Sequence, residues 1–190
     1  MSYKTAEIAV IRHGPTEWSV ARRFAGSIDL PLTDAGREAT RAARARIDAA
    51  RFDEVISSPL VRARETAELL GAAPRIDERL RERDYGEFEG LTTAEIRERV
   101  PGWNVWADDV PGGESLADFT ARVDAVVAEL RERESGAVLL VTHAHWMRLF
   151  AARWLGLGPE GAALFRASEL GLTRLGWERE NPVMLTWNCT

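Results

Sequence analysis

The chain has 190 residues, which is enough for one domain with a buried core, and its 45% hydrophobic and 29% charged residues are ordinary for a soluble globular protein. No stretch of about 18 apolar residues is present, and the N-terminus lacks the pattern of a signal peptide, so we expect a cytoplasmic protein that does not enter a membrane. The net charge of −5 disfavours a general nucleic-acid binder. Cys189 is the only cysteine, which excludes an internal disulfide and a cysteine-based metal cluster.

The first half of the chain alternates short apolar runs with helical segments. In chain order the sequence predicts a strand over 8–11, a helix from the cap Thr33-Asp34 to about residue 50, and a strand at 55–56. A helix over 60–70 follows, with Ser58 as N-cap and Pro59 as its first residue, and then a short strand at 75–76. The polar, glycine-containing stretch 80–90 is predicted to be a loop.

The second half continues the alternation. The sequence predicts a short helix over 92–100, a long amphipathic helix from the cap Ser115 to about residue 134, and a strand over 137–141. A helix to about 155 and a small helix from Pro159 follow, and two strands or a hairpin over 170–177 and 183–187 come last. Strands alternating with helices favour an α/β fold, a three-layer sandwich whose mostly parallel central sheet is flanked by helices. In such sheets ligands bind at the carboxyl edge.

Two of the predicted strands end in histidine. The run at 8–11 leads into Arg12-His13-Gly14, and the run at 137–141 leads into Thr142-His143-Ala144-His145. The chain has three histidines, and all of them fall in these two segments, which scattered core or surface histidines would rarely do. This placement favours a functional role over a structural one.

The residue types near these ends suit phosphoryl transfer. Arg12 and Arg62 lie at a strand end and a helix start, where cations and backbone N–H groups stabilise a charged phosphoryl group. A neutral imidazole can attack phosphorus, and a loop carboxylate such as Glu82 can protonate the leaving oxygen. A metal site using His143, His145 and Asp84 is an alternative, but no carboxylate cluster accompanies these residues.

Several motifs, in order along the chain, carry a resemblance to a known family. They are Arg12-His13-Gly14-x-Thr16, Pro31-Leu32-Thr33, Ser57-Ser58-Pro59-x-x-Arg62-Ala63, Leu80-Arg81-Glu82, Tyr85-Gly86, Gly112-Gly113-Glu114-Ser115 and Thr142-His143-x-His145. Together they resemble the signatures of the histidine phosphatase superfamily, which includes cofactor-dependent phosphoglycerate mutases. The stretches 84–90 and 103–106 are more similar to the branch of broad acid phosphatases and sedoheptulose-bisphosphatase-like enzymes.

The resemblance implies a phosphoglycerate mutase-like fold and a role for each matched residue. It implies that His13 is the phosphorylated nucleophile, that Arg12, Arg62 and His143 bind the phosphoryl oxygens, and that Glu82 is the acid and base. Glu87 and Glu89 have weaker claims to that role. Ser19, Arg23, the backbone N–H of Gly26, and Ala144 lie where the family borders the phosphate or substrate. We expect a single domain over residues 1–190, with a small insertion at about 91–114 near the active-site edge.

Three positions depart from the family pattern. Pro15 replaces a usual Glu or Gln, Ala25 replaces a hydroxyl residue that faces the phosphate, and Ala144 replaces a common glycine. Because each central charged group is present, these departures bear on affinity and substrate more than on the reaction. We expect wall residues around 103–106, Glu114 and Trp146 to decide the substrate.

The sequence therefore predicts a metal-independent, cofactor-free phosphatase that acts on a small phosphorylated metabolite such as a sugar phosphate. A cofactor-dependent phosphoglycerate mutase is the alternative, although its familiar members are longer. A non-catalytic module that binds phosphorylated ligands is the alternative from another class. The oligomeric state stays open, with a homodimer as one option.

Overall fold

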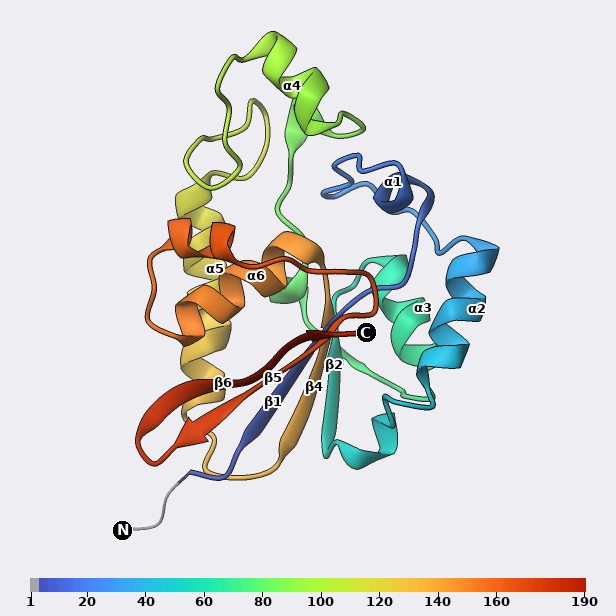
Figure 1. Ribbon diagram of the computed structural model, residues 1–190, viewed down its shortest axis with the longest axis vertical. Coiled ribbons are helices and arrows are strands. Elements are labelled where there is room, and N and C mark those ends of the chain that lie inside the picture. The colour runs from blue at the N-terminus through green and yellow to red at the C-terminus, as the bar shows by residue number, and fades with distance from the viewer. Residues whose placement is uncertain (1–3) are drawn as a thin grey trace.

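A six-stranded sheet runs through the centre of the computed structural model, which describes residues 4–190, and helices flank both of its faces (Figure 1). The strands are β1 (Glu7–Arg12), β2 (Glu54–Ser57), β3 (Arg75–Ile76), β4 (Ala137–Thr142), β5 (Leu172–Glu178) and β6 (Asn181–Cys189). Their spatial order is β3-β2-β4-β1-β5-β6; the first four are parallel, and β5 and β6 pair antiparallel. The predicted α/β class is confirmed.

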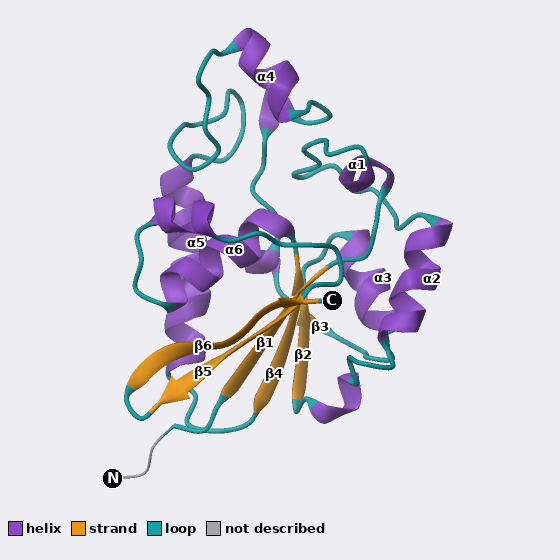
Figure 2. Ribbon diagram, viewed as in Figure 1, coloured by secondary structure: helices purple, strands orange, loops and turns teal. Residues whose placement is uncertain are grey.

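The helices connect these strands in chain order. They are α1 (Glu17–Val20), α2 (Asp34–Ala43), α3 (Val61–Leu69), α4 (Thr93–Arg99), α5 (Leu116–Arg131) and α6 (Ala144–Trp154), with short 3₁₀ turns at 49–51, 78–80, 86–88 and 159–164. Figure 2 shows α2 and α3 on one side of the sheet and α5 and α6 on the other. Within the described residues 4–190, none of the helices combines the length and hydrophobicity needed to cross a bilayer.

Alternating side chains of the central strands build two separate cores. In β1, Ile8 and Val10 pack with α5 and α6, whereas Ala9 and Ile11 pack with α2 and α3. This is the two-residue period of a strand whose faces are both covered by helices. It explains why the sequence of β1 is a continuous apolar run rather than an alternating one.

Helix α6 is buried on most of its surface, and aromatic side chains recur along one of its faces. Trp146 stacks on Phe150 with ring centroids 4.9 Å apart, and Phe150 lies 6.1 Å from Trp154, each pair spaced four residues. All three rings are fully buried. This packing fixes the start of α6 against the end of β4, next to His143.

Two predicted helix boundaries were wrong. Helix α2 ends at Ala43 rather than near residue 50, because Ile47 is buried and the Asp48 side chain accepts a hydrogen bond from the Ala50 N–H, which closes a separate turn. Helix α3 begins at Val61, so Pro59 is not its first residue. The Asp29 carboxylate accepts from the Val61 N–H at 2.7 Å and so caps this helix from a distant loop.

The other predicted elements lie close to their expected ranges. Ser115 caps α5 through its side-chain oxygen, as the sequence predicts, and Thr92 caps α4 in the same way. After α4, the chain returns through a loop in which Trp103 packs its ring edge-on against Phe24 and Phe88. Figure 1 shows α4 and α1 beyond the edge of the sheet where the parallel strands end.

Candidate active site

The two strand-end histidines lie side by side because β1 and β4 are neighbours in the sheet. The parallel register pairs Arg12 with Thr142, so the next residue of each strand is a histidine. The His13 N–H donates to the Thr142 carbonyl at 2.9 Å, and the ring centroids of His13 and His143 are 5.3 Å apart. Residues 130 positions apart in sequence are thus brought to one point at the carboxyl edge of the sheet.

The orientation of the His13 ring leaves one nitrogen free. Its Nδ1 lies 2.7 Å from the Gly14 carbonyl oxygen, which can only accept, so Nδ1 carries the proton and Nε2 keeps its lone pair. Burial, followed by the charges of Arg62 and Arg12, holds the pKa of His13 well below its usual range. His13 is therefore a neutral imidazole with a free Nε2, the form that a nucleophile requires.

Gly14 is required for this arrangement by close packing. A Cβ at this position would lie 2.4 Å from Thr40 Oγ1, and the Gly14 N–H already donates to Thr66 Oγ1 at 3.0 Å. The turn after His13 is thus held between α2 and α3, and a larger residue would displace it.

Arg62 projects from the first turn of α3 and joins three parts of the site. Its Nε donates to His143 Nδ1 at 3.2 Å, Nη1 donates to the Ile28 carbonyl at 2.8 Å, and Nη2 donates to the Gly26 carbonyl at 2.9 Å. Burial lowers the pKa of Arg62 to about 10, which leaves the side chain charged near neutral pH. Arg62 therefore places a positive charge beside both histidines and holds the loop at 26–28 over them.

His143 is fixed by the hydrogen bonds on both sides of its ring. Because Nδ1 accepts from Arg62, the proton is on Nε2, which lies 2.7 Å from Ser58 Oγ and donates to it. The side chain is fully buried, and burial followed by the Arg62 charge holds its pKa well below the usual range. Ser58 therefore orients His143 rather than capping α3 as the sequence predicts.

Arg12 reaches across the end of the sheet to the segment before β5. Its Nη1 donates to the Ala167 carbonyl at 2.9 Å, and Nη2 lies 3.2 Å from Glu169. Its Nε is buried without a hydrogen-bond partner among the described residues. Burial lowers the pKa of Arg12, as expected for a cation that its surroundings neutralise only in part.

Glu82 lies at the N-terminus of α6 and accepts hydrogen bonds from three backbone N–H groups. Its Oε1 accepts from Trp146 at 3.0 Å and from Arg83 at 3.2 Å, and its Oε2 accepts from His145 at 3.0 Å. Burial would raise the pKa of Glu82, but the contacts with the His145 side chain and these N–H groups outweigh it and leave the pKa lowered. In the free protein Glu82 is a carboxylate.

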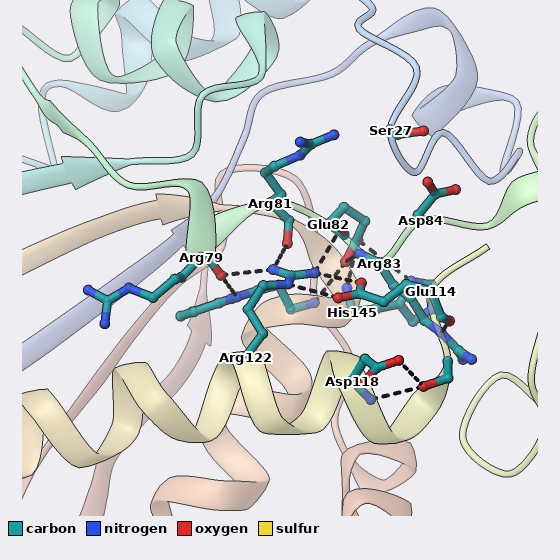
Figure 3. Close-up of polar contacts among 12 residues, drawn as sticks. Ser27, Arg79, Arg81, Glu82, Arg83, Asp84, Glu114, Asp118, Arg122 and His145 are labelled. Carbon is teal, nitrogen blue, oxygen red and sulfur yellow. Dashed lines mark hydrogen bonds and ion pairs between the residues drawn. The ribbon is translucent and has the colours of Figure 1, made fainter.

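The backbone around Glu82 is anchored from below by α5. Arg122 donates to the carbonyl oxygens of Arg79 and Arg81 at 2.8 Å each and pairs with Glu114 at 2.7 Å (Figure 3). This network leaves Glu82 little freedom to move. Glu114, which the sequence analysis expects at the substrate wall, pairs with Arg122 and is not one of the residues that line the cavity described below.

These groups surround a cavity of about 410 Å³. The sequence-predicted residues that line it are Arg12, His13, Ser19, Arg23, Gly26, Arg62, Glu82 and Ala144. His143 is not one of the lining residues, and it contacts Arg62, which is. Ser19 also belongs to the capping box of α1, and Arg23 pairs with Glu95 at 2.9 Å. Ala25 lines the cavity as well, whereas Glu87 and Glu89 do not.

The cavity walls differ from the sequence prediction. Trp146 is fully buried and its Nε1 donates to the Arg79 carbonyl, and Trp103 and Trp106 pack into the cores, so none of these tryptophans lines the cavity. The other lining residues fall into two groups. Thr16, Tyr85 and His145 belong to the sequence motifs but received no site role. The sequence reasoning missed Arg22, Phe24, Thr93, Arg148, Phe165, Arg166 and Ala167. The four-residue spacing of Ala144 and Arg148, which places both on one helical face, was a signal that could have found Arg148.

The charge of the cavity is strongly positive. Its lining includes one acidic residue, Glu82, and six arginines, which are Arg12, Arg22, Arg23, Arg62, Arg148 and Arg166. A chain with a net charge of −5 therefore concentrates cations at one place. Such a cavity attracts anionic ligands of the size of a small metabolite.

The two histidines of the second motif point to different partners. The His143 ring bonds Ser58 and Arg62, whereas the His145 Nδ1 lies 2.8 Å from the Tyr85 hydroxyl. Within residues 4–190, no group of three or more His, Cys, Asp or Glu side chains is placed to hold a metal ion. The alternative that uses Asp84 with both histidines therefore does not fit this geometry.

Comparison with known proteins identifies the family of this chain. The family profile of the histidine phosphatase superfamily, branch 1, matches residues 8–190. An acid phosphatase of Mycobacterium tuberculosis is 38% identical, with 94% of this chain and 90% of that protein covered. A sedoheptulose 1,7-bisphosphatase of Saccharomyces cerevisiae is 30% identical (82% and 70% covered), and a probable phosphoglycerate mutase of Salmonella choleraesuis is 30% identical (95% and 89% covered).

Solved structures show the same fold over nearly the whole chain. An open-reading-frame product of Mycobacterium tuberculosis superposes with a TM-score of 0.92 at 34% identity, covering 97% of this chain and 98% of the other. A mycobacterial glucosyl-3-phosphoglycerate phosphatase superposes with a TM-score of 0.82 at 31% identity, covering 97% and 99%. The chain therefore belongs to branch 1 of the histidine phosphatase superfamily and is a phosphoric monoester hydrolase.

Proposed function

We propose that this protein hydrolyses small phosphomonoesters, sugar phosphates or related metabolites, through a phosphohistidine on His13 and without a metal ion. The observation that carries this proposal is the free Nε2 of a neutral His13 at a cavity lined by six arginines. Relatives named for a sugar bisphosphate and a glucosylated phosphoglycerate support the substrate class.

The proposed reaction has two steps. His13 Nε2 attacks phosphorus while the bond to the leaving oxygen breaks, and Glu82, protonated in the substrate complex, gives that oxygen its proton. Water then attacks the phosphohistidine, the N–P electron pair returns to His13, and the water proton returns to Glu82. Arg12 and Arg62 stabilise the phosphoryl charge in both steps, and His143 holds Arg62 in place.

The alternatives differ in what happens to the phosphoryl group. A mutase returns the phosphoryl group to the substrate, and a binding module leaves it on the ligand. We expect hydrolysis of p-nitrophenyl phosphate, also in EDTA, and little isomerisation of 3-phosphoglycerate with or without 2,3-bisphosphoglycerate. Fast cofactor-dependent isomerisation with negligible hydrolysis would identify a mutase, and phosphate binding without turnover over a broad substrate panel would identify a binding module.

We also propose that residues 91–114 form an insertion at the active-site edge of a single domain. Thr93 of α4 lines the cavity, and the buried Arg83 donates to the carbonyls of Val105, Asp108 and Glu114, which ties the returning loop to the Glu82 segment. The insertion would therefore shape the side of the cavity where the alcohol part of the substrate binds.

Replacement of Arg62 with alanine is expected to lower kcat by about 10²–10³-fold, because it removes a buried positive charge beside His13, where the phosphoryl charge would develop. It also releases the carbonyls of Gly26 and Ile28, so KM for small phosphomonoesters should rise. Arg64→Ala is the matched control, since Arg64 is an exposed arginine on the same helix. Steady-state kinetics of both variants measure the difference, and equal kinetics would contradict the role of Arg62.

Ala25→Thr is expected to tighten inhibition by inorganic phosphate. Ala25 lines the cavity, and a hydroxyl at this position would add a donor to a charged group, worth about 1.5–3 kcal/mol or roughly a 10- to 150-fold change in the inhibition constant. KM for small phosphomonoesters should fall in parallel, with phosphorylation of His13 intact. An unchanged inhibition constant in a folded variant would show that residue 25 does not face the phosphate.

A further inference from the structure

Glu82 has a feature that its proposed role as an acid does not explain. Three backbone N–H groups donate to its two oxygens, an arrangement that favours the carboxylate over the carboxylic acid. An acid must nevertheless hold a proton when the leaving oxygen departs. A proton has to reach Glu82 after the substrate has bound, along a path that the buried side chain itself does not supply.

His145 lies between Glu82 and the cavity. Its Nδ1 is 3.7 Å from Glu82 Oε2 and 2.8 Å from the Tyr85 hydroxyl oxygen. The ring lines the cavity. Buried nitrogen and oxygen atoms without a hydrogen-bond partner occur among the described residues, and His145 Nε2 is not one of them. One ring nitrogen thus faces the carboxylate, and the other is open to the cavity.

The His145 ring is held in this position by aromatic contacts. Phe24 stacks on it with ring centroids 5.6 Å apart and an interplanar angle of 10°, and Trp106 packs at 5.3 Å. The charged and titratable groups that face it are Glu82, Tyr85, Arg148 and Arg12. Burial lowers the pKa of His145, the Glu82 carboxylate opposes that shift, and the arginines add to it.

The Tyr85 hydroxyl can hydrogen-bond to His145 in either protonation state of the ring. Burial raises the pKa of Tyr85 well above its usual range, so it stays a phenol. A phenol can donate to a bare Nδ1 or accept from a protonated one. The hydrogen bond at 2.8 Å therefore survives when His145 gains or loses a proton, which an amide or carbonyl partner would not allow.

We propose that His145 carries protons between the cavity and Glu82, with Tyr85 as the positioning residue that keeps the ring aligned in both states. This proposal rests on the proposed function. When the substrate phosphate binds, its negative charge favours protonation nearby. Nε2 takes a proton from a cavity water, bulk solvent returns a proton to that water, and Nδ1 gives its proton to Glu82 Oε2. After phosphate leaves, the proton returns by the same path.

The proton transfer through His145 leaves the bonds broken and formed in the hydrolysis unchanged. In the first step the P–O bond breaks, its electron pair goes to the leaving oxygen, and that oxygen takes the proton from Glu82. In the second step the attacking water replaces this proton on Glu82. His145 only loads and unloads the carboxylate at the start and end of each cycle. The transfer requires the 3.7 Å between Nδ1 and Glu82 Oε2 to close to hydrogen-bond length by a movement of the His145 ring.

The test uses His145→Ala and Tyr85→Phe in the full-length protein, with folding checked by circular dichroism. For an alkyl phosphate, kcat of His145→Ala should fall by about 10- to 100-fold, whereas p-nitrophenyl phosphate, which needs little protonation, should lose less than about threefold. Added imidazole should restore a large part of the alkyl phosphate activity. Tyr85→Phe should lose several-fold on the alkyl phosphate only.

The pH profile separates a relay from a structural role. Because His145 helps to lower the pKa of Glu82, its removal should move the alkaline limb of kcat for the alkyl phosphate to higher pH while the plateau falls. An unmoved profile, equal losses on both substrates, or no rescue by imidazole overturns the proposal. If His145→Ala does not fold, His145→Gln is measured by the same substrate and pH criteria.

The outcome for the relay is distinguishable from that for the proposed function. Phosphohistidine trapped on His13 of the His145 variants after mixing with p-nitrophenyl phosphate shows that the covalent reaction stands, whatever the alkyl phosphate result. Absence of a phosphoenzyme in the wild-type protein would instead refute the proposed function itself.

Discussion

His13→Ala is expected to abolish phosphate ester hydrolysis, with kcat falling on the order of 10⁴-fold or more. Among the other histidines, His143 uses both ring nitrogens on Arg62 and Ser58. His145 Nδ1 is bonded to Tyr85 and lies 3.7 Å from Glu82 Oε2, so we assign this ring to proton transfer rather than to attack on phosphorus. Rapid quench with a ³²P-labelled substrate measures the loss directly, because the acid-labile label on the wild-type protein should be missing from the variant.

The variant must fold for this result to count. Removing the imidazole loses the hydrogen bond to the Gly14 carbonyl, but the turn stays anchored by the backbone bond from residue 13 to Thr142 and by Thr66. His13→Asn is a polar control of nearer size. If either folded variant keeps label at the wild-type level, the nucleophile is another residue.

Glu82→Gln is expected to slow alkyl phosphates by about 10²–10⁴-fold, and p-nitrophenyl phosphate far less, because a good leaving group needs little protonation. The dependence of kcat on the pKa of the leaving group should become steeper than in the wild-type protein. An equal loss on both substrates would count against proton donation by Glu82.

This substitution also has a structural cost. An amide presents an NH₂ group where one carboxylate oxygen now accepts from backbone N–H groups, so a donor faces a donor and the start of α6 should lose about 1–3 kcal/mol of stability. Thermal unfolding measures this separately from kinetics. Glu87→Gln is the matched control, because Glu87 does not line the cavity and should leave both quantities nearly unchanged.

The order and type of the main elements could be predicted because their local signals agree with the final packing. The continuous apolar runs of β1 and β4 reflect coverage by helices on both faces, and Ser115 caps α5 by a purely local hydrogen bond. The predicted helix boundaries were wrong where groups far away in the sequence determine where a helix starts. The start of α3 depends on Asp29 in another loop, and no pattern near Pro59 reveals that.

The site could be predicted in part for the same reason. Residues at strand ends share one edge of a parallel sheet, so His13 and His143 could be placed together from their position in the motifs. The cavity walls depend on which face of α6 and which loops turn inward. Trp146 and His145 are adjacent in sequence, yet one is fully buried in the core and the other lines the cavity.

The position of β1 in the middle of the sheet has a consequence for synthesis of the protein. This strand pairs with β4 at 137–142 and β5 at 172–178, so both of its neighbours are synthesised long after it. An apolar strand without a partner is prone to aggregation. Residues 7–12 therefore have no strand partner until β4 has been made, and hydrolytic activity can arise only after β4 and α6 have emerged.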